Sequence, residues 1–234
     1  MGNYIILNNK ISTSIQGLLI QSLSPISKPK IRTQIEEIDG RDGDIIIPLG
    51  YSAYDKEITV GLFGDFDIDE IINFFNEIGT IIFSNEPDKY YNFEIIEQID
   101  FEKLIRFRTA KVRIHVQPFK YSAEDNSRTF NITDESSISI RNAGNIYSKP
   151  KIKITGSGDI GLYLNNIQIF QIALGELGSI TIDTNLMEAY NGTNLLNRFI
   201  AGNYENFKLK IGNNNISWTG TITKIEMDNY SRWI

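Results

Sequence analysis

The sequence predicts a mainly β fold with one α-helix, arranged in two domains. Apolar and polar residues alternate over many short segments, which is typical of half-buried strands, and a single segment has apolar residues at helical spacing. A polar, weakly patterned stretch follows Tyr121. We therefore expect an α+β domain over residues 1–121, a linker over 122–136 and an all-β domain over 137–234.

The composition supports two packed cores. The chain has 234 residues, of which 41% are hydrophobic and 11% aromatic, enough apolar matter for folded domains. It contains no cysteine, which excludes disulfides, thiolate nucleophiles and thiolate metal sites. Stability must therefore come from packing or from assembly.

The predicted helix runs from Ile68 to Ile78. Asp67 is placed to cap its first turn, with Glu70 three residues on as a capping-box partner, and Gly79 stands where a left-handed residue ends many helices. One apolar stripe is formed by Ile68, Ile71, Ile72, Phe75 and Ile78.

Strands surround this helix on both sides. The Asp-Gly dipeptides between Ile35 and Pro48 predict a hairpin, and Ile58 to Leu62 alternates as a strand. Further strands are expected over Thr80–Phe83, Tyr91–Ile96 and Phe107–Gln117. In the last of these, Val112, Ile114 and Val116 should face the core while Arg113, His115 and Gln117 face solvent. We expect the helix to cover one face of an antiparallel sheet.

The C-terminal part has the strand spacing of a β-sandwich. Asn165-Asn166 and Asn213-Asn214-Asn215 look like turns between strands. The expected strands are Ser137–Arg141, Lys151–Thr155, Gly161–Leu164, Gln168–Ala173, Ser179–Asp183, Phe207–Ile211 and Ser217–Met227.

The charge balance disfavours direct binding of nucleic acid. The 23 basic and 29 acidic residues give a net charge of −6, whereas phosphate binding requires a basic surface. Residues 1–121 contain 13 basic and 18 acidic side chains, a balance of −5. Residues 122–234 contain 10 and 11, a balance of −1, so the acidity is concentrated in the first part.

Two motifs resemble ligand-binding sequences, but the residues around them do not fit a ligand site. Gly156-Ser-Gly-Asp-Ile-Gly161 matches the dinucleotide-binding pattern, but the residues that follow continue as strand, so no helix N-terminus receives the phosphates and a hairpin turn is expected instead. The run of carboxylates from Asp65 to Glu70 lacks the glycine and glutamate of a calcium loop, and helix capping explains it better.

No residue emerges as catalytic, cofactor-binding or metal-binding. His115 is the only histidine, so mechanisms and metal sites that need a histidine pair are excluded. Acidic residues are plentiful, but the sequence indicates no particular pair for glycoside hydrolysis. The chain lacks a basic, apolar leader and any apolar run of about 20 residues, so we expect neither a signal peptide nor a membrane span.

Taken in order, several segments resemble those of siphophage distal tail proteins. In the N-terminal part they are Asp39-Gly-Arg-Asp-Gly43, the strand Ile58–Leu62, the capped helix, Phe83-Ser-Asn-Glu-Pro-Asp-Lys-Tyr-Tyr91 and Pro118-Phe-Lys-Tyr121. In the C-terminal part they are Asn142-Ala-Gly144, Lys149 to Gly158, Ile180-Thr-Ile-Asp183 and Gly212 to Trp218. The resemblance covers nearly the whole chain.

This resemblance implies a non-enzymatic virion structural protein of a siphovirus tail tip. The N-terminal domain would form a homohexameric hub ring, single or stacked, and the C-terminal domain would be a galectin-like sandwich. The ring would join the tail tube protein to the tail-associated tip protein and dock receptor-binding or baseplate proteins for host attachment. The protein would be made in the host cytoplasm, without membrane contact, and DNA would pass through the acidic ring without specific binding.

Two readings from other classes stay open at this point. The chain could instead be a carbohydrate-binding β-sandwich module of an adhesin, with exposed tyrosines and Trp218 stacking on sugar rings. It could also be a glycan hydrolase built on the sandwich. Residues 137–234 contain no histidine and no sugar-binding signature, so the implied likeness to galectins concerns architecture and not lectin activity.

Overall fold

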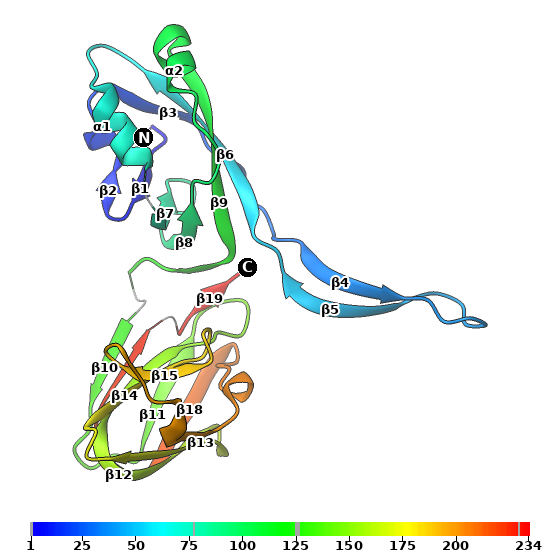
Figure 1. Cartoon of the computed structure of the whole chain (residues 1–234), viewed down its shortest axis with the longest axis vertical. Helices are drawn as coiled ribbons and strands as arrows, with labels where there is room; N and C mark the ends of the chain where they lie inside the picture. The colour runs from blue at the N-terminus through cyan, green and yellow to red at the C-terminus, as the bar shows by residue number, and fades with distance from the viewer. Residues whose placement is uncertain (1, 77, 125–126, 229) are drawn as a thin grey trace. The chain divides into compact units, whose positions relative to one another are not determined.

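The computed structural model describes residues 2–76, 78–124, 127–228 and 230–234 (Figure 1). The chain divides into two compact units, one comprising Met1–Ala123 with Ile234 and the other Glu124–Trp233. Residue 77 of the predicted helix and residues 125–126 of the predicted linker lie outside the described residues. Both units are built mainly from strands, as the sequence predicts.

The first unit is built on an antiparallel sheet with the strand order β2-β1-β7-β8-β9-β6-β3. Its core lies on one face of this sheet, where Val112, Ile114 and Val116 are fully buried, while Arg113 on the opposite face is exposed. The predicted facing of this strand is therefore confirmed. The strands are β1 (Ile5–Leu7), β2 (Lys10–Ile11), β3 (Leu18–Ser22), β6 (Tyr54–Leu62), β7 (Ile78–Phe83), β8 (Lys89–Glu94) and β9 (Thr109–Ser122).

The first unit also carries the predicted hairpin and two α-helices. The hairpin consists of β4 (Ile31–Glu36) and β5 (Ile45–Tyr51), and a 3-10 turn covers Ser12–Ser14. The helices are α1 (Ile68–Phe75) and α2 (Phe101–Phe107). The prediction of a single helix was therefore wrong.

Helix α1 begins as predicted and ends three residues early. The Asp67 carboxylate accepts hydrogen bonds from the backbone N–H groups of Asp69 and Glu70, which confirms the cap. Gly79 does not end the helix, since it lies in β7 with φ 145°, and Asn8 explains why. The Asn8 side chain bonds the backbone on both sides of Gly79, at Ile78 O and Thr80 N, and occupies the space of a Cβ. Ile78, predicted on the apolar stripe, is 67% exposed in this strand.

Helix α2 occupies residues where the sequence predicts only strand and connection. Asp100 caps it by accepting a bond from the Lys103 N–H, and Arg108 ends it in the left-handed conformation at φ 57°. Only Leu104 is buried. Seven residues make two turns, too short for a helical period to stand out from the alternation around them.

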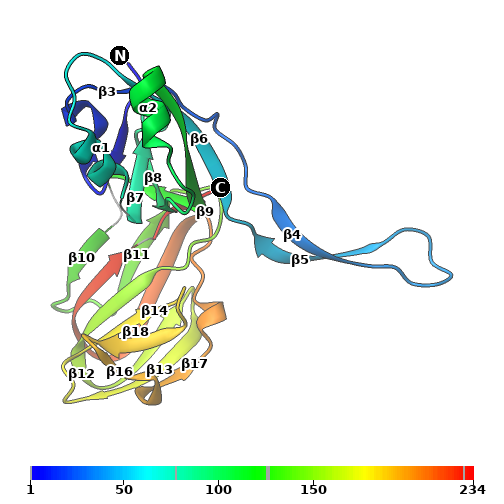
Figure 2. The same ribbon diagram turned by 45° about the horizontal axis from the view of Figure 1, so that its top comes forward.

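The second unit is built around two long strands, β12 and β18, which pair with each other and with β10, β11, β13 and β14 (Figure 2). Its core contains Ile140, Ile154, Phe170 and Phe207, all essentially buried. The strands are β10 (Ser127–Asn131), β11 (Ser137–Asn142), β12 (Lys151–Leu164), β13 (Ile167–Gly175), β14 (Ser179–Asp183), β15 (Glu188–Asn191), β16 (Asn194–Leu195), β17 (Ile200–Gly202), β18 (Gly212–Asp228) and β19 (Arg232–Trp233); 3-10 turns cover Asn197–Phe199 and Tyr204–Asn206.

The glycine motif at 156–161 lies inside β12, so the predicted hairpin turn was wrong. The ladder with β18 shifts register here, and β12 pairs with β14 before the shift and with β13 after it. Gly158 has φ 75° on β12, and Gly220 has φ 87° on β18. These glycines let both long strands bend where their ladder shifts register. Strand β12 continues past the motif to Leu164, so no helix N-terminus lies behind these glycines to bind a phosphate.

Three further expectations fail in the second unit. Part of the predicted linker forms strand β10, because Phe130 packs on the core and residues 127–131 pair with β18. The segment 207–211 makes a single bridge, Leu209 to Ser148, instead of a strand. Asn213–Asn215, predicted as a turn, lie in β18 opposite β11. The predicted turn at Asn165-Asn166 is confirmed, with φ of 52° and 69°.

The side chain of Asn214 explains two of these differences, the irregular segment 207–211 and the strand at 213–215. Its side chain is buried, accepts from the Lys210 N–H at 3.0 Å, and donates to the carbonyls of Lys210 and Gly212 at 2.8 and 3.0 Å. One amide thus satisfies the irregular backbone that precedes β18. A buried asparagine can therefore begin a strand, which a pattern of asparagines alone does not show.

Replacing Asn214 by alanine is expected to lower the free energy of unfolding by about 2 kcal/mol, since buried backbone groups lose their partners. Trp218 lies on the same strand, so urea unfolding followed by tryptophan fluorescence reports the change. Asn213→Ala is the matched control. Asn213 is exposed, and its loss should cost less than about 0.5 kcal/mol. Equal effects of the two substitutions would contradict the role given to Asn214.

Candidate functional site: the arm and its anchor

Residues 31–51 form an arm that leaves the body of the first unit (Figures 1 and 2). Within the described residues, β4 and β5 pair only with each other. Every residue of β4 is exposed, and β5 is exposed or half-buried throughout. The arm therefore projects into solvent with both of its edges free.

Residues in the connecting loop and in β5 favour a hairpin. Gly40 and Gly43 adopt φ of 80° and 78° in the connecting loop, which the Asp-Gly dipeptides favour. Pro48 lacks a backbone N–H, and it is tolerated because β5 is an edge strand with a register shift beside it. The predicted hairpin is confirmed.

One face of the arm is apolar, and apart from Tyr51 at its root, which packs edge-on against Phe119, its larger side chains are mostly exposed. Cross-strand pairs on this face join Ile31 to Tyr51 and Ile35 to Ile46. The exposed fraction is 58% for Ile35 and 64% for Ile46, and Leu49 beside them is 54% exposed. A two-stranded hairpin is marginal in water by itself, and an apolar face of this kind usually marks a contact surface.

The tip of the arm, residues 36–44, is acidic. It contains five carboxylates and one basic residue, Arg41, a balance of −4. Ile38 lies among these charges and is 49% exposed. The arm thus combines an apolar face with an acidic end.

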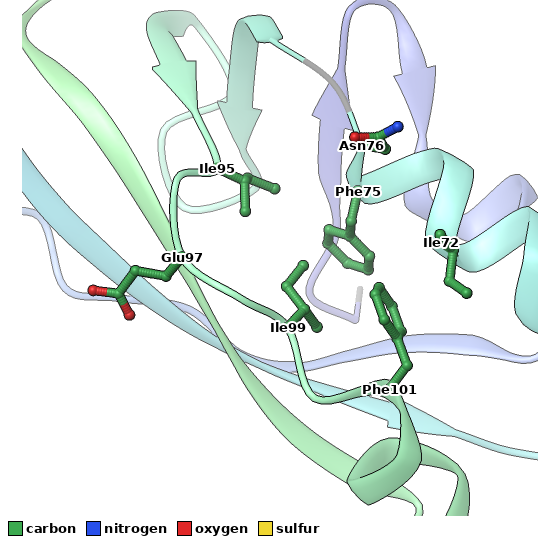
Figure 3. A pocket seen from close by; sticks show the side chains of 7 residues that line it. All are labelled: Ile72, Phe75, Asn76, Ile95, Glu97, Ile99 and Phe101. Atoms are coloured by element: carbon green, nitrogen blue, oxygen red, sulfur yellow. The ribbon is translucent and has the colours of Figure 1, made fainter.

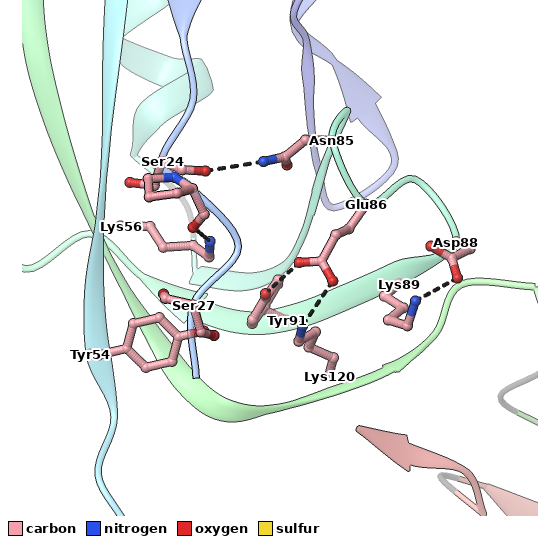
Figure 4. A network of polar contacts seen from close by, with 11 residues as sticks. Ser24, Ser27, Tyr54, Lys56, Asn85, Glu86, Asp88, Lys89, Tyr91 and Lys120 are labelled. Atoms are coloured by element: carbon pink, nitrogen blue, oxygen red, sulfur yellow. Dashed lines mark hydrogen bonds and ion pairs between the residues drawn. The ribbon is translucent and has the colours of Figure 1, made fainter. Parts of the chain in front are cut away.

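A set of hydrogen bonds holds the chain where it enters the arm (Figure 4). The Lys56 ammonium on β6 donates to the Pro25 carbonyl at 3.1 Å, and the Ser24 hydroxyl donates to the Glu57 carbonyl at 2.7 Å. Asn85 donates to the Ser24 carbonyl at 3.1 Å. The irregular segment before the arm is therefore fixed to β6 and to the β7–β8 turn.

Lys56 belongs to a buried polar cluster, here called the anchor, formed by Lys56, Glu86, Tyr91 and Lys120. Glu86 accepts from the Tyr91 hydroxyl at 2.9 Å and from the Lys120 ammonium at 2.8 Å. Lys56 is 1% exposed, with its ammonium over the rings of Phe83 and Tyr91. Lys120 thus forms a direct ion pair with Glu86, whereas Lys56 donates to Pro25 and feels the carboxylate only through space.

Burial dominates the acid–base behaviour of the anchor. It lowers the pKa of Lys56, with the Glu86 carboxylate acting in the opposite direction. It also raises the pKa of Tyr91, which the carboxylate beside it reinforces. Tyr91 therefore stays a neutral hydrogen-bond donor. The cluster acts as a structural support rather than a reactive centre.

The structure resembles solved phage proteins over its full length. It matches the SPP1 Dit protein, described as a paradigm of the hub adsorption apparatus in phages that infect Gram-positive bacteria, with a TM-score of 0.63 and 16% identity, covering 100% of both chains. The chain has the Dit fold. It also matches a chain of the phage p2 baseplate in its activated conformation with Sr, with a TM-score of 0.51, 10% identity and 97% of each chain covered.

The Dit fold confirms, at the level of structure, the resemblance seen in the sequence. No protein-family model matches the sequence, and no curated protein does. At 16% identity the likeness lies in the order of elements and not in shared side chains. The role of the arm and its anchor must therefore be argued from this chain's own residues.

The sequence-predicted candidates lie on different elements of the structure. His115 contacts Asp55 at 2.7 Å on the outer face of β9, and the carboxylate run at 65–70 surrounds the start of α1. Trp218, on which the sugar-stacking reading depended, is 6% exposed in the core of the second unit. Across the described residues, no group of three or more histidine, aspartate or glutamate side chains could hold a metal ion.

An apolar hollow of about 180 Å³ lies between α1 and the segment that joins β8 to α2 (Figure 3). Phe75, Ile99 and Phe101 point toward one another there, and Glu97 points away to pair with Arg113 at 2.7 Å. The hollow presents no nucleophile or general base. No described helix has the length and apolar character that crossing a membrane requires.

Sequence reasoning predicted the hairpin but did not single out Ile35, Ile46 and Leu49 as exposed apolar residues. Lys56 was not singled out either. A lysine within an alternating strand is usually exposed, so the sequence gives little indication that Lys56 is buried.

Proposed function

We propose that this chain is a non-enzymatic structural protein of a phage tail tip. Six copies form a hub ring that joins the tail tube to the tip protein, and receptor-binding or baseplate proteins dock on that ring. The full-length likeness to the SPP1 Dit hub protein supports this proposal. The acidic balance of residues 1–121, −5, suits a ring through which DNA passes, because a negative lumen repels phosphate.

The arm is the observation that carries the proposal. Its exposed isoleucines gain nothing within one copy, so a partner must supply the covering surface. The anchor fixes the segment before the arm through the bond from Lys56 to Pro25, so the arm leaves the unit from a held root. A ring requires heterologous contacts, in which one patch meets a different patch on its neighbour, and a projecting arm provides one such patch.

The second domain, residues 137–234 together with strand β10, has the role of a galectin-like sandwich that presents docking surface outward from the ring. Its tryptophan at 218 is in the core and unavailable for sugar stacking. Protein docking is therefore favoured over lectin activity.

The tail-tip location can be tested in particles produced by the strain that encodes the chain. An affinity tag at the C-terminus, detected with gold-labelled antibody in the electron microscope, should mark the tail end distal to the capsid. A label on capsids, or particles without label despite expression of the tagged chain, would contradict the proposal.

A further inference from the structure

A hollow of about 270 Å³, here called the socket, lies on the outer face of the second unit. Asp159 lines it from β12, and Arg198 lines it from the 3-10 turn that precedes β17, with β13 between these two elements. Its floor includes Ala173 on β13 and Ala201 on β17, two exposed residues with short side chains. The socket therefore has an anionic side, a cationic side and an open floor.

The two charges of the socket are not neutralised within the second unit. Neither Asp159 nor Arg198 forms an ion pair with any residue that the structure describes. One strand separates β12 from β17, so their backbones lie about 10 Å apart. A carboxylate and a guanidinium thus face one hollow, and both are available to a ligand that lies between them.

A bulge in β12 sets the position of Asp159. The ladder between β12 and β13 shifts register between Gly158 and Asp159, and the ladder between β12 and β18 shifts over the same segment. Gly220 of β18 allows this bend, because a Cβ at that position would collide with the Asp159 carbonyl oxygen. Bulges re-aim side chains and are common beside active sites. The direction of Asp159 is therefore set by the backbone.

Arg198 is held by the ring beside it. Its guanidinium lies 4.7 Å from the ring centre of Phe199, and Phe199 packs on the core of the unit. Asn197, which begins the same 3-10 turn, accepts from the Ala189 N–H at 2.6 Å. A guanidinium stacked on a fixed ring loses little freedom on binding, and its planar fork matches a carboxylate. Arg198 is therefore suited to bind a carboxylate through two parallel hydrogen bonds.

Gln171 on β13 adds a third polar group between the two charges. Its Oε1 accepts from the Gln168 side chain at 2.9 Å, which leaves its own N–H groups for another acceptor. It pairs with Ala201 across the ladder and so lies beside the floor. The socket thus offers an acceptor, an amide donor and a guanidinium donor to a short ligand.

We infer that the socket captures the free C-terminal end of a protein that docks on the second unit. The terminal carboxylate binds Arg198, a backbone carbonyl accepts from Gln171, and a lysine ammonium two residues before the end donates to Asp159. Two extended residues span about 7 Å, which fits between strands about 10 Å apart.

A chain end is favoured over an internal segment because it alone carries a carboxylate directly on its backbone, where the alanine floor lets it approach. The inference rests on the proposed docking role of the second unit and names its recognition chemistry.

Methyl NMR of the full chain tests this inference, because Ala173 and Ala201 place methyl groups on the floor of the socket. The probe is the peptide acetyl-Lys-Ala-Ala with a free carboxylate. Both methyl resonances should shift and saturate, while that of Ala110 in the first unit stays fixed. The same peptide ending in a carboxamide should bind at least tenfold more weakly, since Arg198 loses its charged partner. Equal binding of the two peptides, or no saturable shift with the free acid, would overturn the inference.

Substitutions locate the bound peptide. Arg198→Gln should weaken binding of the free acid at least tenfold, and Asp159→Asn should weaken acetyl-Lys-Ala-Ala but leave acetyl-Ala-Ala-Ala unchanged. Arg141→Gln is the matched control, since Arg141 is exposed on β11 of the same unit and does not line the socket. Full binding by the Arg198 variant, or an equal loss in the Arg141 variant, would place the peptide elsewhere and refute the socket.

Particles from the strain that encodes the chain show whether assembly uses the socket. Tails built with Arg198→Glu should retain the chain and lose at least nine tenths of one other tail protein, measured by mass spectrometry of purified particles. A complete set of proteins in these tails would overturn the inference and leave the hub standing. Wild-type particles that lack the chain would overturn the proposed function together with the inference that rests on it.

Discussion

Replacing Glu86 by glutamine is expected to lower the stability of the first unit by about 3 kcal/mol or more. Glu86 is the only carboxylate in the buried anchor, and the substitution keeps its shape while leaving Lys120 without its ion-pair partner and removing the negative charge that acts on Lys56. Breaking a buried pair by removing one partner costs more than the pair itself contributes. The Tyr91 hydroxyl also loses its charged acceptor.

Hydrogen exchange measures this effect within the intact chain. Amides of β8 and β9 should exchange at least 100-fold faster in the variant, while those of β18 in the second unit keep their protection. Glu57→Gln is the control, because Glu57 pairs with Lys111 on the exposed face of the same sheet. That pair should contribute less than about 1 kcal/mol. Unchanged exchange in Glu86→Gln would show that the anchor is not energetically coupled to the sheet.

Replacing Ile35 and Ile46 together by threonine is expected to weaken self-association at least 100-fold without destabilising the monomer. Threonine keeps the β-branched shape that suits a strand, and both positions are already exposed in one copy. Burial of an isoleucine contributes about 1.5–3 kcal/mol, so losing two at an interface costs about 3 kcal/mol or more. A factor of ten in affinity corresponds to about 1.4 kcal/mol.

Sedimentation velocity over a range of concentrations gives the association constant, and thermal unfolding under dilute conditions gives monomer stability. Ile167→Thr is the control, since Ile167 is 65% exposed on the second unit. It should leave association unchanged. Self-association of the double variant at wild-type strength would mean that the arm's apolar face remains in solvent after assembly.

The elements that could be predicted from the sequence are those whose pattern is local. The Asp67 cap, the hairpin at the Asp-Gly dipeptides and the facing of Val112, Ile114 and Val116 each follow from a few neighbouring residues, and each is confirmed. The order of such segments also carried the likeness to phage tail proteins.

The failures share a physical origin in contacts between residues distant along the chain. Gly79 was expected to end a helix, but the Asn8 side chain holds it in a strand. Gly158 was expected in a turn, but its strand bends opposite Gly220 on β18. A local sequence pattern does not reveal a contact with a residue some 60 or 70 positions away.

The arm shows why the functional surface was harder to predict than the fold. Alternating apolar residues indicate that one face of a strand is buried, but not which chain covers it. Ile35 and Ile46 pair across the predicted hairpin and nevertheless remain exposed in one copy. Their exposure becomes visible only when the rest of the unit is in place.

Native mass spectrometry of the purified full chain tests the hub proposal most directly. The account predicts a closed assembly of about 160 kDa, six times the chain mass of 26.6 kDa, which the Ile35→Thr and Ile46→Thr double variant loses. A spectrum containing only the 26.6 kDa monomer from low to high micromolar concentration would contradict the proposal that this chain forms a hub ring.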